Sequence, residues 1–240
     1  MPPEPGRPAV AAPPSLLQSL QSLLERTYRM KTGIVDIGRF VIGDEGYRLF
    51  YGPGGRASVT RVAASAAAGA RVLVHDGPGP LSARIYYPDS LIRSLERCPP
   101  SRGLGDENID PFATFVEELD HLLLIAERGR LRRPVSLLEL ELHANVTKYL
   151  VCALFLAPRR GGRARAPLDP QTRLWLRWHL FEKIAFAEPD PKVSVRYSDA
   201  SRFARRFLDR LDREPDASSR LARLRAFHAA THQEKLAELV

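Results

Sequence analysis

Residues 117–121, with the sequence Glu-Glu-Leu-Asp-His, are the part of this chain best suited to chemistry. Successive residues of an α-helix are about 100° apart, so Glu117 and His121 lie one turn apart and Glu118 lies beside both. Two carboxylates and an imidazole on one side of a helix can hold a metal ion and a general base together. The spacing therefore predicts a candidate metal site.

The helix that carries these residues is expected to have protein on two of its faces. Apolar side chains in residues 112–126 form one broad arc that faces the core. Glu117, Glu118 and His121 fall on the opposite side, but Ile125 lies there as well. We therefore expect the acid–histidine cluster to be at least partly buried, where unpaired carboxylates are costly. Either a metal ion or an arginine would compensate them.

The next helix offers a second pair of the same kind. Ser136 and Glu139 have the spacing of a capping box, which predicts a helix from Ser136 to about Leu156. Glu139 and His143 lie one turn apart on it, while Glu141 belongs to a separate polar strip. If the two helices pack antiparallel, the pairs could meet, and four oxygen and imidazole ligands would suit zinc, iron or manganese. The predicted metal ligands are Glu117, His121, Glu139 and His143.

The segment Glu117-Glu118-x-x-His121 resembles a degenerate form of the zincin metallopeptidase motif His-Glu-x-x-His, with glutamate at the first histidine position. In zincins, strands precede the motif helix and a further ligand follows on a later helix. This chain has predicted strands before the motif, and Glu139 or Glu141 follows at a suitable distance.

The resemblance implies that Glu118 is the general base and His121 a metal ligand, with Glu117 in place of the missing histidine. It makes Glu139 the candidate third ligand and zinc the first choice of metal. An active chain would be a metal-dependent, peptidase-like hydrolase, in which the base deprotonates a metal-bound water. An inactive one would be a degenerate metallohydrolase that keeps the metal site.

Other interpretations of the same residues stay open. Carboxylate-bridged di-metal bundles use repeated Glu-x-x-His pairs, and Glu118 with His121 fits that spacing, but Leu140 stands where the second helix needs its glutamate. Alternatively, the cluster is a metal-free hydrogen-bonded network that closes a helix–helix interface with Arg128 or Lys148.

His228 and His232 are another pair of histidines at one-turn spacing, which is good chelating geometry. The apolar neighbours of these residues are equally typical of an ordinary amphipathic helix. The sequence does not choose between the two.

The charge distribution suggests a function of a different class. The net charge is +8, and residues 158–240 carry about +7 of it. The alternative to a metal site is therefore a non-catalytic interaction protein that binds an acidic partner or nucleic acid through its basic C-terminal helices. Arginines alternate with acids there, which is typical of a solvated, salt-bridged face and argues against nucleic acid. The partner itself is unknown, with an acidic protein as the candidate.

The amino-acid composition limits the class of protein and the cellular compartment that the chain can belong to. The chain has 240 residues, of which 44% are hydrophobic and 27% charged, as in ordinary globular proteins. The longest apolar run, residues 149–158, is too short to span a membrane, and the N-terminus lacks the pattern of a secretory signal. Cys98 and Cys152 are too few for a disulfide scaffold. These features predict a cytoplasmic protein.

The order of elements predicts an α+β fold, with a small antiparallel β-sheet at about residues 33–87 followed by a predominantly helical region. Residues 1–14 are rich in proline and alanine and are expected to form a disordered tail. Residues 15–240 are expected to be a single domain, with the sheet in 15–100 and the helical part in 101–240. The expected strands are 34–41 and 47–51, joined by a turn at 43–46, then 72–75 and 83–87, with 192–197 extended. The expected helices are 15–28, 89–98, 110–128, 136–156, 170–186, 198–211 and 217–239.

Overall fold

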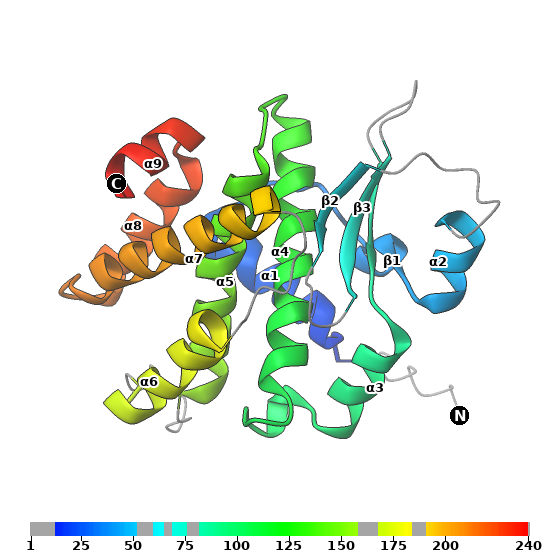
Figure 1. The fold of residues 1–240 in the computed structure, drawn as a ribbon, viewed down its shortest axis with the longest axis horizontal. Helices are drawn as coiled ribbons and strands as arrows, with labels where there is room; N and C mark the ends of the chain where they lie inside the picture. Colours follow the sequence, from blue (N-terminus) through cyan, green and yellow to red (C-terminus); the bar gives the residue numbers. More distant parts are fainter. Residues whose placement is uncertain are drawn as a thin grey trace, which may run out of the picture.

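The computed structural model describes residues 13–51, 60–64, 69–75, 82–157, 168–183 and 191–239. The predicted tail, residues 1–14, lies almost entirely outside these ranges. The described residues form an α+β structure that is mostly helical, as predicted (Figure 1).

The α-helices follow from signals in the sequence. Ser15 caps the first through a capping box with Gln18, and Ser136 caps α5 by accepting a hydrogen bond from the Glu139 backbone N–H. The helices are α1 (Leu16–Tyr28), α2 (Asp44–Tyr51), α3 (Asp89–Arg97), α4 (Ile109–Arg130), α5 (Leu137–Leu156), α6 (Pro170–Arg177), α7 (Pro191–Asp212), α8 (Ala217–Ala229) and α9 (His232–Leu239). Short 3₁₀ turns η1 (Ile37–Phe40) and η2 (Pro100–Arg102) and a π-helical turn η3 (Trp178–Glu182) accompany them.

A four-stranded sheet precedes the long helices. Its strands are β1 (Val41–Ile42), β2 (Thr60–Ala64), β3 (Arg71–His75) and β4 (Ser82–Tyr86), in the order β1-β4-β3-β2. The predicted strands at 72–75 and 83–87 correspond to β3 and β4, which pair antiparallel with Val72 opposite Ile85. The sheet is not wholly antiparallel, because β1 runs parallel to β4.

The predicted hairpin at residues 34–51 is wrong. Asp36 caps a 3₁₀ turn by accepting a hydrogen bond from the Gly38 N–H, and residues 44–51 form α2 instead of a strand. Their aromatic content favours a strand by propensity alone, but Tyr47 and Tyr51 are at helical spacing and their rings lie 5.9 Å apart. Tyr47 also stacks on Tyr86 with ring centroids 4.3 Å apart, which fixes the helix against β4.

Three boundaries in the helical part also differ from expectation. Residues 192–197 are not extended but belong to α7, because Tyr197 and Ala200 share the buried face of one helix. The predicted helix 217–239 is two helices, since Thr231 and Glu234 form a capping box that starts α9 anew. Finally, α4 continues past Gly129 to Arg130.

The longest helices build the centre of the molecule. Figure 1 shows α4 between the sheet on one side and α5 on the other, with α7 packed on α5. Every residue of α4 from Phe112 to Ile125 is buried, which confirms that this helix has protein on both faces. Polar side chains in this stretch are therefore forced into contact with neighbouring helices. None of the described helices has the length and apolarity needed to cross a lipid bilayer.

Candidate metal centre

Glu117 and His121 of α4 lie against Glu141 of α5. Each offers one ligand atom, and these atoms all lie within 4.8 Å of one another. The two α4 residues are one helical turn apart, and the antiparallel α5 brings the third from across the interface. The side chains are almost fully withdrawn from solvent, at 8%, 0% and 1% exposure. The sequence thus identified two members of a buried cluster that could hold a metal ion.

The hydrogen bonding of this cluster is incomplete. Within the described part of the chain, neither ring nitrogen of His121 has a hydrogen-bond partner, and neither does Oε1 of Glu141. The closest approach between them joins His121 Nε2 to Glu141 Oε2, at 3.8 Å, which is too long for a hydrogen bond. A buried polar group without a partner costs about 1–3 kcal/mol. A cation held between the imidazole and the carboxylates would satisfy these atoms.

A lysine shares the cluster. The Nζ of Lys148 donates to Glu117 Oε2 at 2.9 Å. Burial, followed by the negative charge of Glu117, raises the pKa of Glu141 to about 8, although Lys148 acts in the opposite direction. Burial also lowers the pKa of His121 below its ordinary value. Without a metal, Glu117 and Lys148 thus form an ion pair, while burial favours the protonated carboxyl of Glu141 and the neutral imidazole of His121.

His143, a predicted ligand, belongs to a different network. Its Nδ1–H donates to Asp120 Oδ2 at 2.8 Å, and its Nε2 lies 3.1 Å from Nδ1 of His228. His228 Nε2 lies 2.7 Å from Glu127 Oε2, and Thr147 donates to Asp120 Oδ1 at 2.8 Å. All of these side chains are buried, and they join α4, α5 and α8. It is a different network from the metal-free one that the sequence offered as an alternative, which was to join the Glu117–His121 cluster to Arg128 or Lys148.

The imidazoles of His143 and His228 lie between the carboxylates of Asp120 and Glu127, which limits how the protons can be distributed among them. The links Asp120–His143, His143–His228 and His228–Glu127 need three protons, one more than two neutral imidazoles carry. Burial opposes ionisation of Asp120, yet the charge and hydrogen bond of His143 outweigh it and lower the Asp120 pKa. The pKa of Glu127 is lowered in the same way, mainly by its hydrogen bond to His228.

Glu139, also predicted as a ligand, is held by two cations. Its Oε1 accepts hydrogen bonds from Lys235 Nζ at 2.7 Å and from Arg128 Nη2 at 3.2 Å. Burial opposes its ionisation, but Lys235 and Arg128 together lower the pKa of Glu139. The predicted general base, Glu118, is fully buried close to Tyr87, whose pKa is raised by burial and by the Glu118 charge. The structure thus places Glu118, Glu139 and His143 outside the Glu117–His121–Glu141 cluster.

The one-turn pair of His228 and His232 does not form a chelating site. The break at residues 230–231 separates the two side chains into different helices. His228 points into the buried network, whereas Nδ1 of His232 lies 3.2 Å from Ser136 Oγ.

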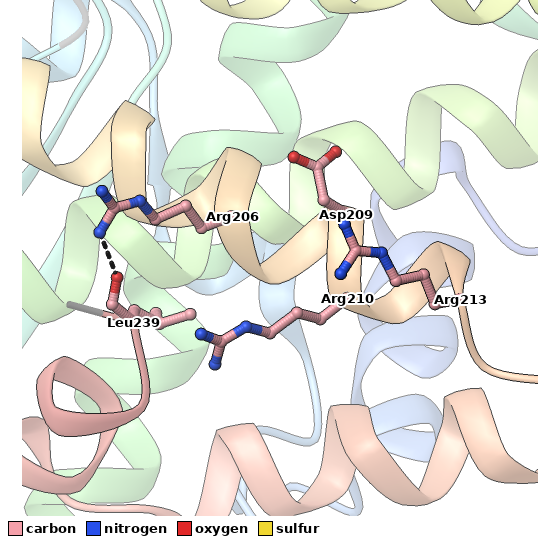
Figure 2. Close-up of a pocket in the computed structure, with 5 residues that line it drawn as sticks. All are labelled: Arg206, Asp209, Arg210, Arg213 and Leu239. Carbon is pink, nitrogen blue, oxygen red and sulfur yellow. Dashed lines mark hydrogen bonds between the residues drawn. The ribbon is translucent and has the colours of Figure 1, made fainter.

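The basic side chains of α7 surround the end of α9. A hollow of about 250 Å³ is lined by Arg206, Asp209 and Arg210 of α7, by Arg213 just after it and by Leu239 of α9. Figure 2 draws these side chains. Arg206 donates to the backbone oxygen of Leu239 at 2.7 Å, and Arg210 donates to that of Glu238. Arginines that bind the last carbonyl groups of a helix stabilise its C-terminus. Some of the arginines that make this region basic therefore serve to hold α9 on α7.

Comparison of the chain with protein-family models, with curated proteins and with solved structures gave no match. The functional argument therefore depends on the geometry of the chain itself.

Proposed function

We propose that this protein binds a divalent transition metal, with zinc as the first choice, between Glu117, His121 and Glu141. The observation that carries the proposal is the fully buried imidazole of His121, whose two nitrogens lack hydrogen-bond partners among the described residues. One imidazole and two carboxylates are a donor set that zinc, manganese and iron accept.

The burial of the cluster favours a structural role for the metal over a hydrolytic one. A catalytic metal keeps a coordination position that substrate can reach, whereas a structural metal is closed off. The cluster residues are at most 8% exposed, and the predicted base Glu118 is not among them. A metal here would join α4 to α5 at the centre of the fold, and its binding free energy would add to the stability of the folded chain.

Metal analysis tests this proposal directly. Protein purified in the presence of zinc and then freed of excess metal should retain about one zinc ion per chain, measured by elemental analysis. The His121→Ala variant should retain essentially none. His179→Ala is the matched control, because His179 is also buried but both of its nitrogens have partners. Absence of zinc, manganese and iron from the unaltered protein after loading would refute the proposal.

The Lys148→Met variant should bind zinc at least about tenfold more tightly than the unaltered protein, because the ammonium competes with the metal for Glu117 and repels it. The affinity is measured by competition with a chromogenic chelator. Lys183→Met is the control, since Lys183 pairs with Asp110 and with no residue of the cluster in the described part of the chain. Equal zinc affinities for Lys148→Met and the unaltered protein would show that the metal does not occupy the place next to this lysine.

A further inference from the structure

A second group of reactive side chains lies in an open groove between the starts of α5 and α9. The groove has a volume of about 700 Å³. Ser136 and His232 lie in its wall beside the apolar residues Pro134, Val135 and Ala229. Charged residues also line the groove, namely Arg128, Arg133, Glu139 and Glu234. Both Ser136 and His232 are partly exposed, so a small molecule in the groove can reach them.

The serine and the histidine are arranged as a nucleophile and its base. Ser136 Oγ lies 3.2 Å from His232 Nδ1, within the range of about 2.6–3.2 Å found for such pairs. Ser136 Oγ also accepts a hydrogen bond from the Glu139 N–H at 3.0 Å. Because this contact uses a lone pair, the hydroxyl proton is left to point at Nδ1. The imidazole is thereby placed to take the proton when the oxygen attacks.

The backbone next to Ser136 suits the charge that would develop. Ser136 is the residue before α5, and the first N–H groups of a helix have no acceptor within it. The N–H of Leu137, which follows the serine, therefore has no acceptor within the helix and can donate to an oxyanion formed at Ser136, as in hydrolases whose serine lies at a helix start. The groove thus combines a nucleophile, a base and a donor for an oxyanion.

From this geometry we propose that Ser136 and His232 form a catalytic dyad that hydrolyses small carboxylic esters. Ser136 Oγ forms a bond to the carbonyl carbon, its proton moves to His232 Nδ1, and the carbonyl oxygen becomes the oxyanion. The C–O bond to the alcohol then breaks, and the alcohol leaves with that proton. Water loses a proton to His232 and attacks the carbonyl carbon of the acyl-serine. The bond from that carbon to Ser136 Oγ then breaks, His232 returns the proton to Oγ, and the carboxylic acid leaves. The apolar residues of the wall fit a short acyl chain.

The test is covalent labelling with a fluorophosphonate probe, followed by peptide mass spectrometry. The unaltered protein should carry the label on Ser136. His232→Gln should slow labelling at least about a hundredfold, since a positioned general base contributes that much. Hydrolysis of p-nitrophenyl acetate should fall in parallel.

Two variants separate reactivity from folding. Ser136→Asn keeps a side chain that caps helices and removes the nucleophile, so it should stay folded by circular dichroism and lose the label. Ser15→Asn changes the serine that caps α1 through the same hydrogen bond and should leave labelling unchanged. A zinc chelator should have no effect, since this dyad is independent of the metal cluster. Labelling at another residue, no labelling at all, or an undiminished rate in His232→Gln would each overturn the proposal.

Discussion

The Asp120→Ala variant is expected to lose about 3–5 kcal/mol of its free energy of unfolding, because it removes a buried carboxylate and leaves two buried hydrogen-bond donors without an acceptor. Asp120 is fully buried and accepts hydrogen bonds from His143 and Thr147, both at 2.8 Å. Removal of the carboxylate leaves these two donors without an acceptor. It also disturbs Tyr28, whose hydroxyl lies 2.9 Å from that of Thr147. Denaturant unfolding at neutral pH, with a two-state fit, measures the loss.

Asp106→Ala is the matched control for Asp120→Ala. Asp106 is likewise hydrogen-bonded to two side chains, the imidazole of His179 and the indole of Trp175. Nε2 of His179 and Nε1 of Trp175 both lie 3.0 Å from its Oδ1. However, its side chain is 79% exposed, and we expect a loss of less than about 1 kcal/mol. Similar losses for the two variants would show that the buried network contributes no more than a surface contact.

The same network determines how stability responds to acid. The folded protein holds the pKa of Asp120 and of Glu127 below their ordinary values, so the unfolded chain takes up protons first as the pH falls. Their contribution to stability is therefore complete above the unfolded pKa of about 4 and is lost as the pH falls through the folded values. The Asp120→Asn variant should show a weaker decline in this range.

The long helices could be predicted because their signals are local. The spacing of Ser136 and Glu139 predicts the start of α5. Ile125 on the polar side of α4 indicates a helix that is buried on both faces. The pairing of Glu117 with His121 follows from the same helical period. By contrast, the aromatic residues of α2 favoured a strand, and the contact of Tyr47 with Tyr86, which decides the outcome, is not local.

The choice of Glu141 over Glu139 could not be predicted, because it depends on how α5 is rotated against α4. The two glutamates are two residues apart and so point in nearly opposite directions. All residues from Glu139 to Tyr149 are buried, so the helix has no apolar face that would orient it from sequence alone. The bond between His228 and Glu127 joins residues 101 positions apart, and no spacing rule covers such a contact.

The affinity for zinc is expected to rise about fiftyfold between about pH 6 and pH 8, since one displaced proton changes the affinity about tenfold per pH unit well below its pKa and less steeply near it. Burial and the charge of Glu117 raise the pKa of Glu141 to about 8, and a carboxylate must lose its proton before it binds metal. Titration with a chelator of known affinity at each pH measures the slope. Glu139→Gln should keep this slope, because Glu139 lies outside the cluster, whereas Glu141→Gln should abolish it. An affinity that is constant over this range would mean that Glu141 gives up no proton to the metal.

The stability of the metal-free protein should change in the opposite direction over the same range. Because the folded pKa of Glu141 is raised, the folded chain holds a proton that the unfolded chain releases at about pH 4. Its contribution is complete below that pH and is lost as the pH rises towards about 8, by at most about 1.4 kcal/mol per pH unit. Saturating zinc removes this loss, because the metal replaces the proton, and Glu141→Gln removes it without metal. A loss of stability between about pH 4 and pH 8 that zinc reverses in the unaltered protein, but that is absent from Glu141→Gln, would thus locate both the proton and the metal at one carboxylate.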